Sequence, residues 1–277
     1  MNRFRFIMML CLLFGVVSSV SADTKYMQLI SDADKAVSKG EYAKAIGLLG
    51  EALHTEPDNS GNVMLMSNIG MLHYYTNNDS MAIAFLSMAH DMAPESITIL
   101  SNRAKVYSDA GYLGNALDDW QSVAELDSTL YRPHLSKGVI YLQLGDTLNA
   151  RVSLERMSQL TDSEKSVECT AALAWLAALT NDNKEGVKQY TILINDEPTA
   201  DLYAARAMCY VELEEYTLAS EDIADGLKLN PDCADLYMAR SLLNKRTYRS
   251  DDAMNDAQRA IELGADKQRV RKIVTEL

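Results

Sequence analysis

Apolar positions recur along this chain with helical spacing, and the whole pattern repeats about every 34 residues. Counted in a frame of about 34 places, the repeats start near residues 26, 63, 97, 131, 167, 200 and 234. The eighth place is always small: Ala33, Gly70, Ala104, Gly138, Ala174, Ala207 and Ser241. So is the twentieth: Ala45, Ala82, Ala116, Ala150, Gly186, Ala219 and Ala253. Two helices cross closely only where both carry small side chains, so the pattern predicts seven packed helix pairs.

Turn and stop signals fall at fixed places in the same frame. The fifteenth place holds residues that tolerate a positive φ in five repeats, namely Gly40, Asn77, Gly111, Gly145 and Asn181, whereas Glu214 and Tyr248 occupy it in the last two. Proline, which cannot extend a helix, follows near the thirty-second place as Pro57, Pro94, Pro198 and Pro231. Each repeat is therefore expected to be a helix, a tight turn, a second helix and a stop.

The combination of small residues at places eight and twenty, an aromatic residue at eleven and proline at thirty-two resembles the tetratricopeptide repeat. The resemblance covers residues 26–265 and is best at 97–130 and 200–233. It implies an all-α, right-handed superhelical solenoid of about seven helix-turn-helix repeats, forming a single domain over residues 23–277. The stretch 266–277 puts Val270, Ile273, Val274 and Leu277 on one helical face, and we expect it to cap the last repeat.

The first 22 residues have the pattern of a secretory signal peptide. Arg3 and Arg5 precede an apolar run over residues 6–17, and small residues end the segment at Ala22. The run is too short to span a bilayer of about 30 Å, so we expect a cleaved, periplasmic or secreted protein with no transmembrane span after cleavage. The alternative is a membrane anchor formed by the uncleaved N-terminal segment.

Charge and cysteine usage narrow the classes of partner and cofactor. The chain has 26 Lys and Arg against 39 Asp and Glu, a net charge of -13, and its cations are dispersed, so nucleic acid is not an expected partner. Cys169, Cys209 and Cys233 lie out of step in the repeat frame, which predicts free thiols and neither a disulfide nor a metal site. No cofactor is expected.

No catalytic motif stands out. The four histidines, His54, His73, His90 and His134, are scattered over three repeats without metal-ligand spacing, and no glycine-rich loop follows a strand pattern. We therefore expect a protein that is not an enzyme.

The tetratricopeptide resemblance implies that certain places of each first helix line a concave binding face. Carried over residue by residue, it marks Met64, Met71, Tyr74, Tyr75, Lys105, Arg132, Leu135, Val139, Leu142, Trp175, Leu179, Met208, Val211, Met238, Leu242, Lys245 and Arg246. Exposed Met and aromatic side chains are typical of recognition surfaces. The alternative is that tighter winding of the solenoid buries these residues against the neighbouring first helices.

These features favour a non-enzymatic scaffold or adaptor of the bacterial cell envelope that binds a peptide segment or partner protein. The alternative hypothesis is a ligand-binding component of envelope glycan or solute handling, with Trp175 and the tyrosines stacking on sugar faces.

Overall fold

The computed structural model describes residues 24–161 and 166–275. The described ranges contain fifteen helices and no strand, which confirms the predicted all-α fold. None of these helices is both long and apolar enough to cross a lipid bilayer. The predicted signal peptide, residues 1–22, lies outside the described residues, as do Leu277 and the side chain of Val274 from the predicted capping helix.

The chain divides into two compact units, one ending at Thr129 and the other beginning at Leu130. The first unit contains α1 (Thr24–Ser38), α2 (Tyr42–Thr55), α3 (Asn62–Tyr75), α4 (Asp79–Met92), α5 (Ile97–Asp109) and α6 (Leu113–Leu126). The second contains α7 (Arg132–Gln143), α8 (Thr147–Leu160), α9 (Val167–Thr180), α10 (Asn183–Asp196), α11 (Ala200–Glu212), α12 (Tyr216–Leu229), α13 (Ala234–Arg246), α14 (Ser250–Glu262) and α15 (Lys267–Thr275). The odd-numbered helices from α1 to α13 start at or within two residues of the predicted repeat starts. The assignment of residues 23–277 to a single domain stays a prediction.

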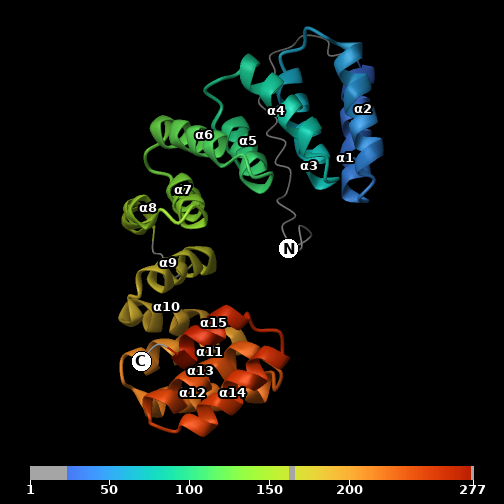
Figure 1. The fold of residues 1–277 in the computed structure, drawn as a ribbon. Coiled ribbons are helices and arrows are strands. Elements are labelled where there is room, and N and C mark those ends of the chain that lie inside the picture. The colour runs from blue at the N-terminus through green and yellow to red at the C-terminus, as the bar shows by residue number, and fades with distance from the viewer. Residues whose placement is uncertain (1–23, 162–165, 276–277) are drawn as a thin grey trace. The chain divides into compact units, whose positions relative to one another are not determined.

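Within each unit, consecutive helices lie side by side as hairpins (Figure 1). The small residues at places eight and twenty are buried in every repeat, as the frame predicts. In the last repeat the Ser241 hydroxyl at place eight donates a hydrogen bond of 2.7 Å to the carbonyl of Ala253 at place twenty. The two places therefore mark the point where the helices of a hairpin cross.

The turn inside each hairpin has the expected left-handed residue in all seven repeats. Glycine or asparagine supplies it in five, with φ between 53° at Asn181 and 85° at Gly111. Glu214 and Tyr248 adopt the same conformation, with φ of 63° and 60°, although their side chains disfavour it. The geometry of the hairpin therefore imposes the turn even where the residue is poorly suited.

Side-chain caps and prolines set the helix boundaries. Seven of the described helices begin with a polar side chain that accepts a hydrogen bond from a backbone N–H of the first turn: Asn78, Ser96, Asp146, Ser166, Asp182, Thr199 and Asp266. Helices α2, α4, α10 and α12 each end two residues before the predicted stop proline.

An Arg–Asp ion pair joins the two helices of three hairpins, and sequence reasoning missed it. Arg206 of α11 binds both carboxylate oxygens of Asp222 of α12, at 2.8 and 2.7 Å, and side-chain exposures are only 14% and 7%. The pairs Arg103–Asp119 and Arg240–Asp256 occupy the same two places of the frame. A recurring Arg and Asp 16 residues apart was the sequence signal.

The last repeat uses this network to replace a missing aromatic residue. Asn244 stands at the eleventh place, where the third, fourth and sixth repeats carry a tyrosine. It is buried and donates to the Asp256 carboxylate at 2.9 Å. A polar contact therefore fills a place that apolar packing fills elsewhere.

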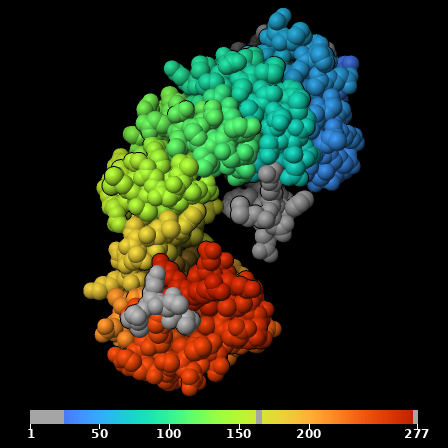
Figure 2. All heavy atoms as spheres, viewed as in Figure 1, coloured from blue at the N-terminus to red at the C-terminus, as the bar shows by residue number. Residues whose placement is uncertain are grey.

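Helix α15 packs on the last hairpin, where the C-terminal cap is expected. Val270 is 2% exposed and clusters with Met238 of α13 and Ala257 and Ala260 of α14. The Lys245 ammonium also donates to the carbonyl of Ile273, at 2.6 Å. In the space-filling view the orange and red atoms of these last helices form one continuous mass (Figure 2).

Candidate functional site

Six of the seventeen residues predicted to line a binding face are buried. They are Met71, Tyr74, Leu135, Leu142, Val211 and Met238, all at most 8% exposed. At these six positions the neighbouring helices bury the side chain, which was the alternative to an exposed binding face. These side chains have almost no exposed surface left for a partner.

The cause of the burial is contact with the next repeat. Met71 and Tyr74 of α3 cluster with Val106 of α5, and the Tyr74 hydroxyl donates to the Asp109 carboxylate. In the second unit, Leu135 and Leu142 of α7 cluster with the apolar residues of α9. Val211 of α11 clusters with Ala239 and Leu243 of α13, and Met238 lies under α15.

All four cations in the predicted set are engaged within the chain. Lys105 pairs with Asp109 at 3.2 Å and lies over the Tyr74 ring, 5.4 Å from its centroid. Arg132 pairs with Glu168, and Arg246 with Glu212, so each of these bridges joins the first helices of two successive repeats. Lys245 holds the capping helix through Ile273. These side chains stabilise the stacking of repeats in this structure.

Half-buried residues make up a further part of the predicted set. They are Tyr75, Val139, Met208 and Leu242, each packed against the edge of an apolar cluster. They contribute to the core and leave only part of their surface for a partner.

The exposed apolar members of the set are Met64, at 41%, and two residues of α9, Trp175 at 39% and Leu179 at 44%. Helix α9 also exposes Val167, at 53%, together with Ala171 and Ala178. These five residues of α9 follow the spacing i, i+4, i+8, i+11 and i+12, which places them on one face of the helix. We call them the α9 stripe: Val167, Ala171, Trp175, Ala178 and Leu179.

The opposite face of α9 is also apolar. Cys169, Ala172 and Leu176 are buried in a cluster with Leu135 and Leu154 of α7 and α8. A surface helix usually carries polar residues on its outer face. On α9 the exposed charge is Glu168 in the first turn, which pairs with Arg132, and the residues after it on that face are apolar. The α9 stripe is therefore a candidate contact surface of about 18 Å along the helix.

Burial shifts the pKa values of several histidines and cysteines that the sequence analysis considered. Burial lowers the pKa of His73 and of His134, which favours neutral imidazoles, and His73 stacks on Phe85 with ring centroids 5.6 Å apart. The thiols of Cys169, Cys209 and Cys233 are free and buried, and burial raises the pKa of Cys209 to about 11. Within residues 24–161 and 166–275, no three His, Cys, Asp or Glu side chains are grouped to hold a metal ion.

Comparison with known families matches residues 200–233, which form α11 and α12, to the model of the tetratricopeptide repeat. The chain contains a tetratricopeptide repeat. The match falls on one of the two repeats whose sequences fit the frame best, and the resemblance drawn from the residues is confirmed.

Solved tetratricopeptide repeat proteins share this fold over most of the chain. A tetratricopeptide repeat protein from Parabacteroides merdae gives a TM-score of 0.65 at 24% identity, covering 91% of this chain and 98% of that one. The C-terminal part of a repeat-containing protein from Cytophaga hutchinsonii gives 0.64 at 14% identity, covering 89% and 100%. At these identities the likeness establishes the fold alone.

Similarity to curated proteins is confined to part of the chain. Human DnaJ homolog subfamily C member 7 is 33% identical over 88 residues, which is 31% of this chain and 18% of that protein. Mouse sperm-associated antigen 1 is 26% identical over 101 residues, or 36% of this chain and 11% of that protein. The chain thus spans less than a fifth of the length of these relatives, and their activities do not transfer with the repeats.

Proposed function

We propose that this tetratricopeptide repeat protein is a non-enzymatic scaffold of the bacterial cell envelope that binds a peptide segment or partner protein on the exposed faces of its first helices. The observation that carries the proposal is the α9 stripe, an apolar surface centred on a half-exposed Trp175. Tetratricopeptide repeats generally serve as protein-interaction scaffolds. Tryptophan is also enriched among the residues that dominate binding energy at protein interfaces.

Within the seventeen predicted residues, we base the proposal on those whose apolar side chains are exposed. The buried residues hold neighbouring repeats together, and the four cations are engaged inside the chain. Trp175 and Leu179 remain as apolar anchors on one helix face. A partner would gain affinity mainly by burying this face, in the way that helices or extended segments use a few apolar anchors.

Site-specific photo-crosslinking in the native cell tests this assignment. A photoreactive amino acid at position 175 should capture a defined protein, and Leu179→Ala should reduce the yield. The control position is Met254 on α14, whose side chain is 61% exposed and lies on a second helix. Equal capture from positions 175 and 254, or no capture from 175, would contradict the proposal.

With a purified partner, the contribution of Trp175 to the binding free energy can be measured. Trp175→Ala should weaken binding by about 2 kcal/mol, roughly thirtyfold, because a central tryptophan usually costs that much when truncated. Met254→Ala should leave the affinity unchanged. An equal loss in both variants would indicate a general effect on folding.

The envelope location rests on residues 1–22, whose charged, apolar and small-residue segments fit a signal peptide. N-terminal sequencing of the protein from fractionated cells should find Asp23 as the first residue in the periplasmic or secreted fraction. A membrane fraction that retains residues 1–22 would favour the anchored alternative.

A further inference from the structure

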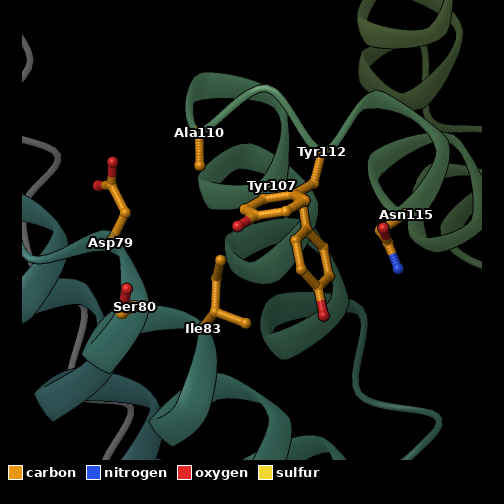
Figure 3. Close-up of a pocket in the computed structure, with 7 residues that line it drawn as sticks. All are labelled: Asp79, Ser80, Ile83, Tyr107, Ala110, Tyr112 and Asn115. Atoms are coloured by element: carbon orange, nitrogen blue, oxygen red, sulfur yellow. The ribbon is translucent and has the colours of Figure 1, made fainter.

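The unit that ends at Thr129 contains a cleft of about 480 Å³ between the N-terminal end of α4 and the α5–α6 hairpin (Figure 3). This volume falls in the range of small-molecule sites, about 300 to 1,000 Å³. None of the residues that line it belongs to the predicted binding set, and they come from two successive repeats. The cleft is therefore separate from the α9 stripe.

Two tyrosines form the apolar part of the cleft. The rings of Tyr107 and Tyr112 meet edge to face with centroids 6.1 Å apart, and Ile83 lies beside Tyr107 (Figure 3). Tyr107 is half-buried and is held by the Arg103 guanidinium, 5.8 Å from its ring centroid. Tyr112 is 56% exposed, so one face of an aromatic ring is open to a ligand beside a ring that is fixed.

Hydrogen-bond donors and acceptors also line the cleft beside the two tyrosine rings. Asp79 and Ser80 line it from α4, and Asn115 lines it from α6 (Figure 3). A carboxylate accepts, a hydroxyl does both, and a carboxamide offers a donor and an acceptor. The cleft thus presents an aromatic face together with groups that can form hydrogen bonds with several ligand hydroxyls.

The lining also disfavours other ligand classes. No Lys or Arg is among the described residues that line the cleft, so the lining offers no cation to a phosphate or carboxylate ligand. A purely apolar ligand would remove water from the Asn115 carboxamide without replacing its hydrogen bonds. What remains is a neutral molecule with one apolar face and several hydroxyls.

We propose that this cleft binds a neutral saccharide of one or two rings, with a sugar face on Tyr112 and its hydroxyls within reach of Asp79, Ser80 and Asn115. This site goes beyond the proposed scaffold function and does not depend on it. A tetratricopeptide repeat protein with such a site carries a glycan contact on one unit and an apolar helix face on the other.

Titration of the ¹⁵N-labelled full chain with cellobiose, maltose and N,N′-diacetylchitobiose tests the site by amide chemical shifts. At least one sugar should shift residues 79–83 and 107–115 in a saturable way. Tyr112→Ala should weaken that binding about tenfold, whereas Tyr112→Phe, which keeps the ring, should change it less than about threefold. Asn115→Ala provides a second variant that leaves both rings in place.

Tyr248→Ala is the matched control, because Tyr248 is also an exposed hairpin-turn tyrosine, at 94%, but lines no part of this cleft. Its affinity should equal that of the unchanged protein. The proposal is overturned if none of the three sugars shifts the cleft residues at millimolar concentration, or if Tyr112→Ala and Tyr248→Ala bind equally. Shifts produced there by inorganic phosphate but not by the sugars would also overturn it, since they would identify an anion site.

Discussion

The close approach of two helices at Gly70 gives the sharpest test of the repeat packing. Gly70 lies at place eight of the second repeat, inside α3. A Cβ atom built there would be 2.8 Å from Leu86 Cγ, 3.1 Å from the carbonyl oxygen of Ala82 and 3.3 Å from the backbone nitrogen of Leu86. Leu86 and Ala82 are fully buried in α4. Two of the three obstacles are backbone atoms, so a side-chain rotation alone cannot make room.

Two opposing terms decide the effect of Gly70→Ala. Alanine is favoured over glycine inside a helix by about 1 kcal/mol. Overpacking a closed core costs about 1 to 3 kcal/mol, because helix α4 would have to move away. The expected net result is a loss of about 1 kcal/mol in the free energy of unfolding.

The Gly47→Ala variant measures the helix preference of alanine without the overpacking. Gly47 is exposed inside α2, and a Cβ there would meet nothing within 4 Å. This variant should gain most of the helix preference, about 0.5 to 1 kcal/mol, so the two variants should differ by about 2 kcal/mol. Urea unfolding followed by helical circular dichroism measures both. If Gly70→Ala stabilises the protein as much as Gly47→Ala does, the two helices do not approach as closely as described.

Two further predictions concern the hairpins. Asp222→Ala leaves the buried Arg206 without its carboxylate and should cost about 3 kcal/mol in thermal or chemical unfolding, whereas Asp225→Ala, which breaks the exposed pair with Lys228, should stay within about 0.5 kcal/mol. Equal effects would show that the Arg206–Asp222 pair is not desolvated. Glu214→Gly should raise the unfolding midpoint by the equivalent of about 1 kcal/mol, because glycine accepts the φ of 63° that strains glutamate, and a destabilised variant would contradict that turn geometry.

The fold followed from the sequence because it depends on local signals repeated many times. Small residues fix where helices cross, turn residues fix where they end, and both recur in one frame. The boundaries at the stop prolines needed no tertiary information. Glu214 and Tyr248 follow the same principle. Their residue types alone would not predict a turn, but their place in the repeat frame does.

The binding face was less predictable because it depends on how far one repeat covers the next. Met71 and Met238 fit a recognition surface by composition, yet α5 buries the first and α15 the second. Periodicity gives the orientation of a side chain on its own helix, but it does not give the distance to the neighbouring helix. The Arg–Asp pairs were missed for a different reason. The Arg and the Asp are 16 residues apart and lie on the two helices of a hairpin, so the periodicity within one helix does not reveal the pair.

Trp175 is the residue whose exposure the repeat architecture does not account for. It occupies place nine, where Met71 is buried and where Met208 and Leu242 are half-buried against an apolar cluster that two successive repeats share. The apolar cluster that contains its neighbour Leu176 does not include Trp175 itself. Trp175 leaves 39% of its surface exposed, and hydration of that apolar surface is unfavourable. Because Cys169, Ala172 and Leu176 pack α9 on α7 and α8 in a cluster that does not include Trp175, truncation of Trp175 should leave that cluster in place, and loss of binding in the variant can be distinguished from loss of structure.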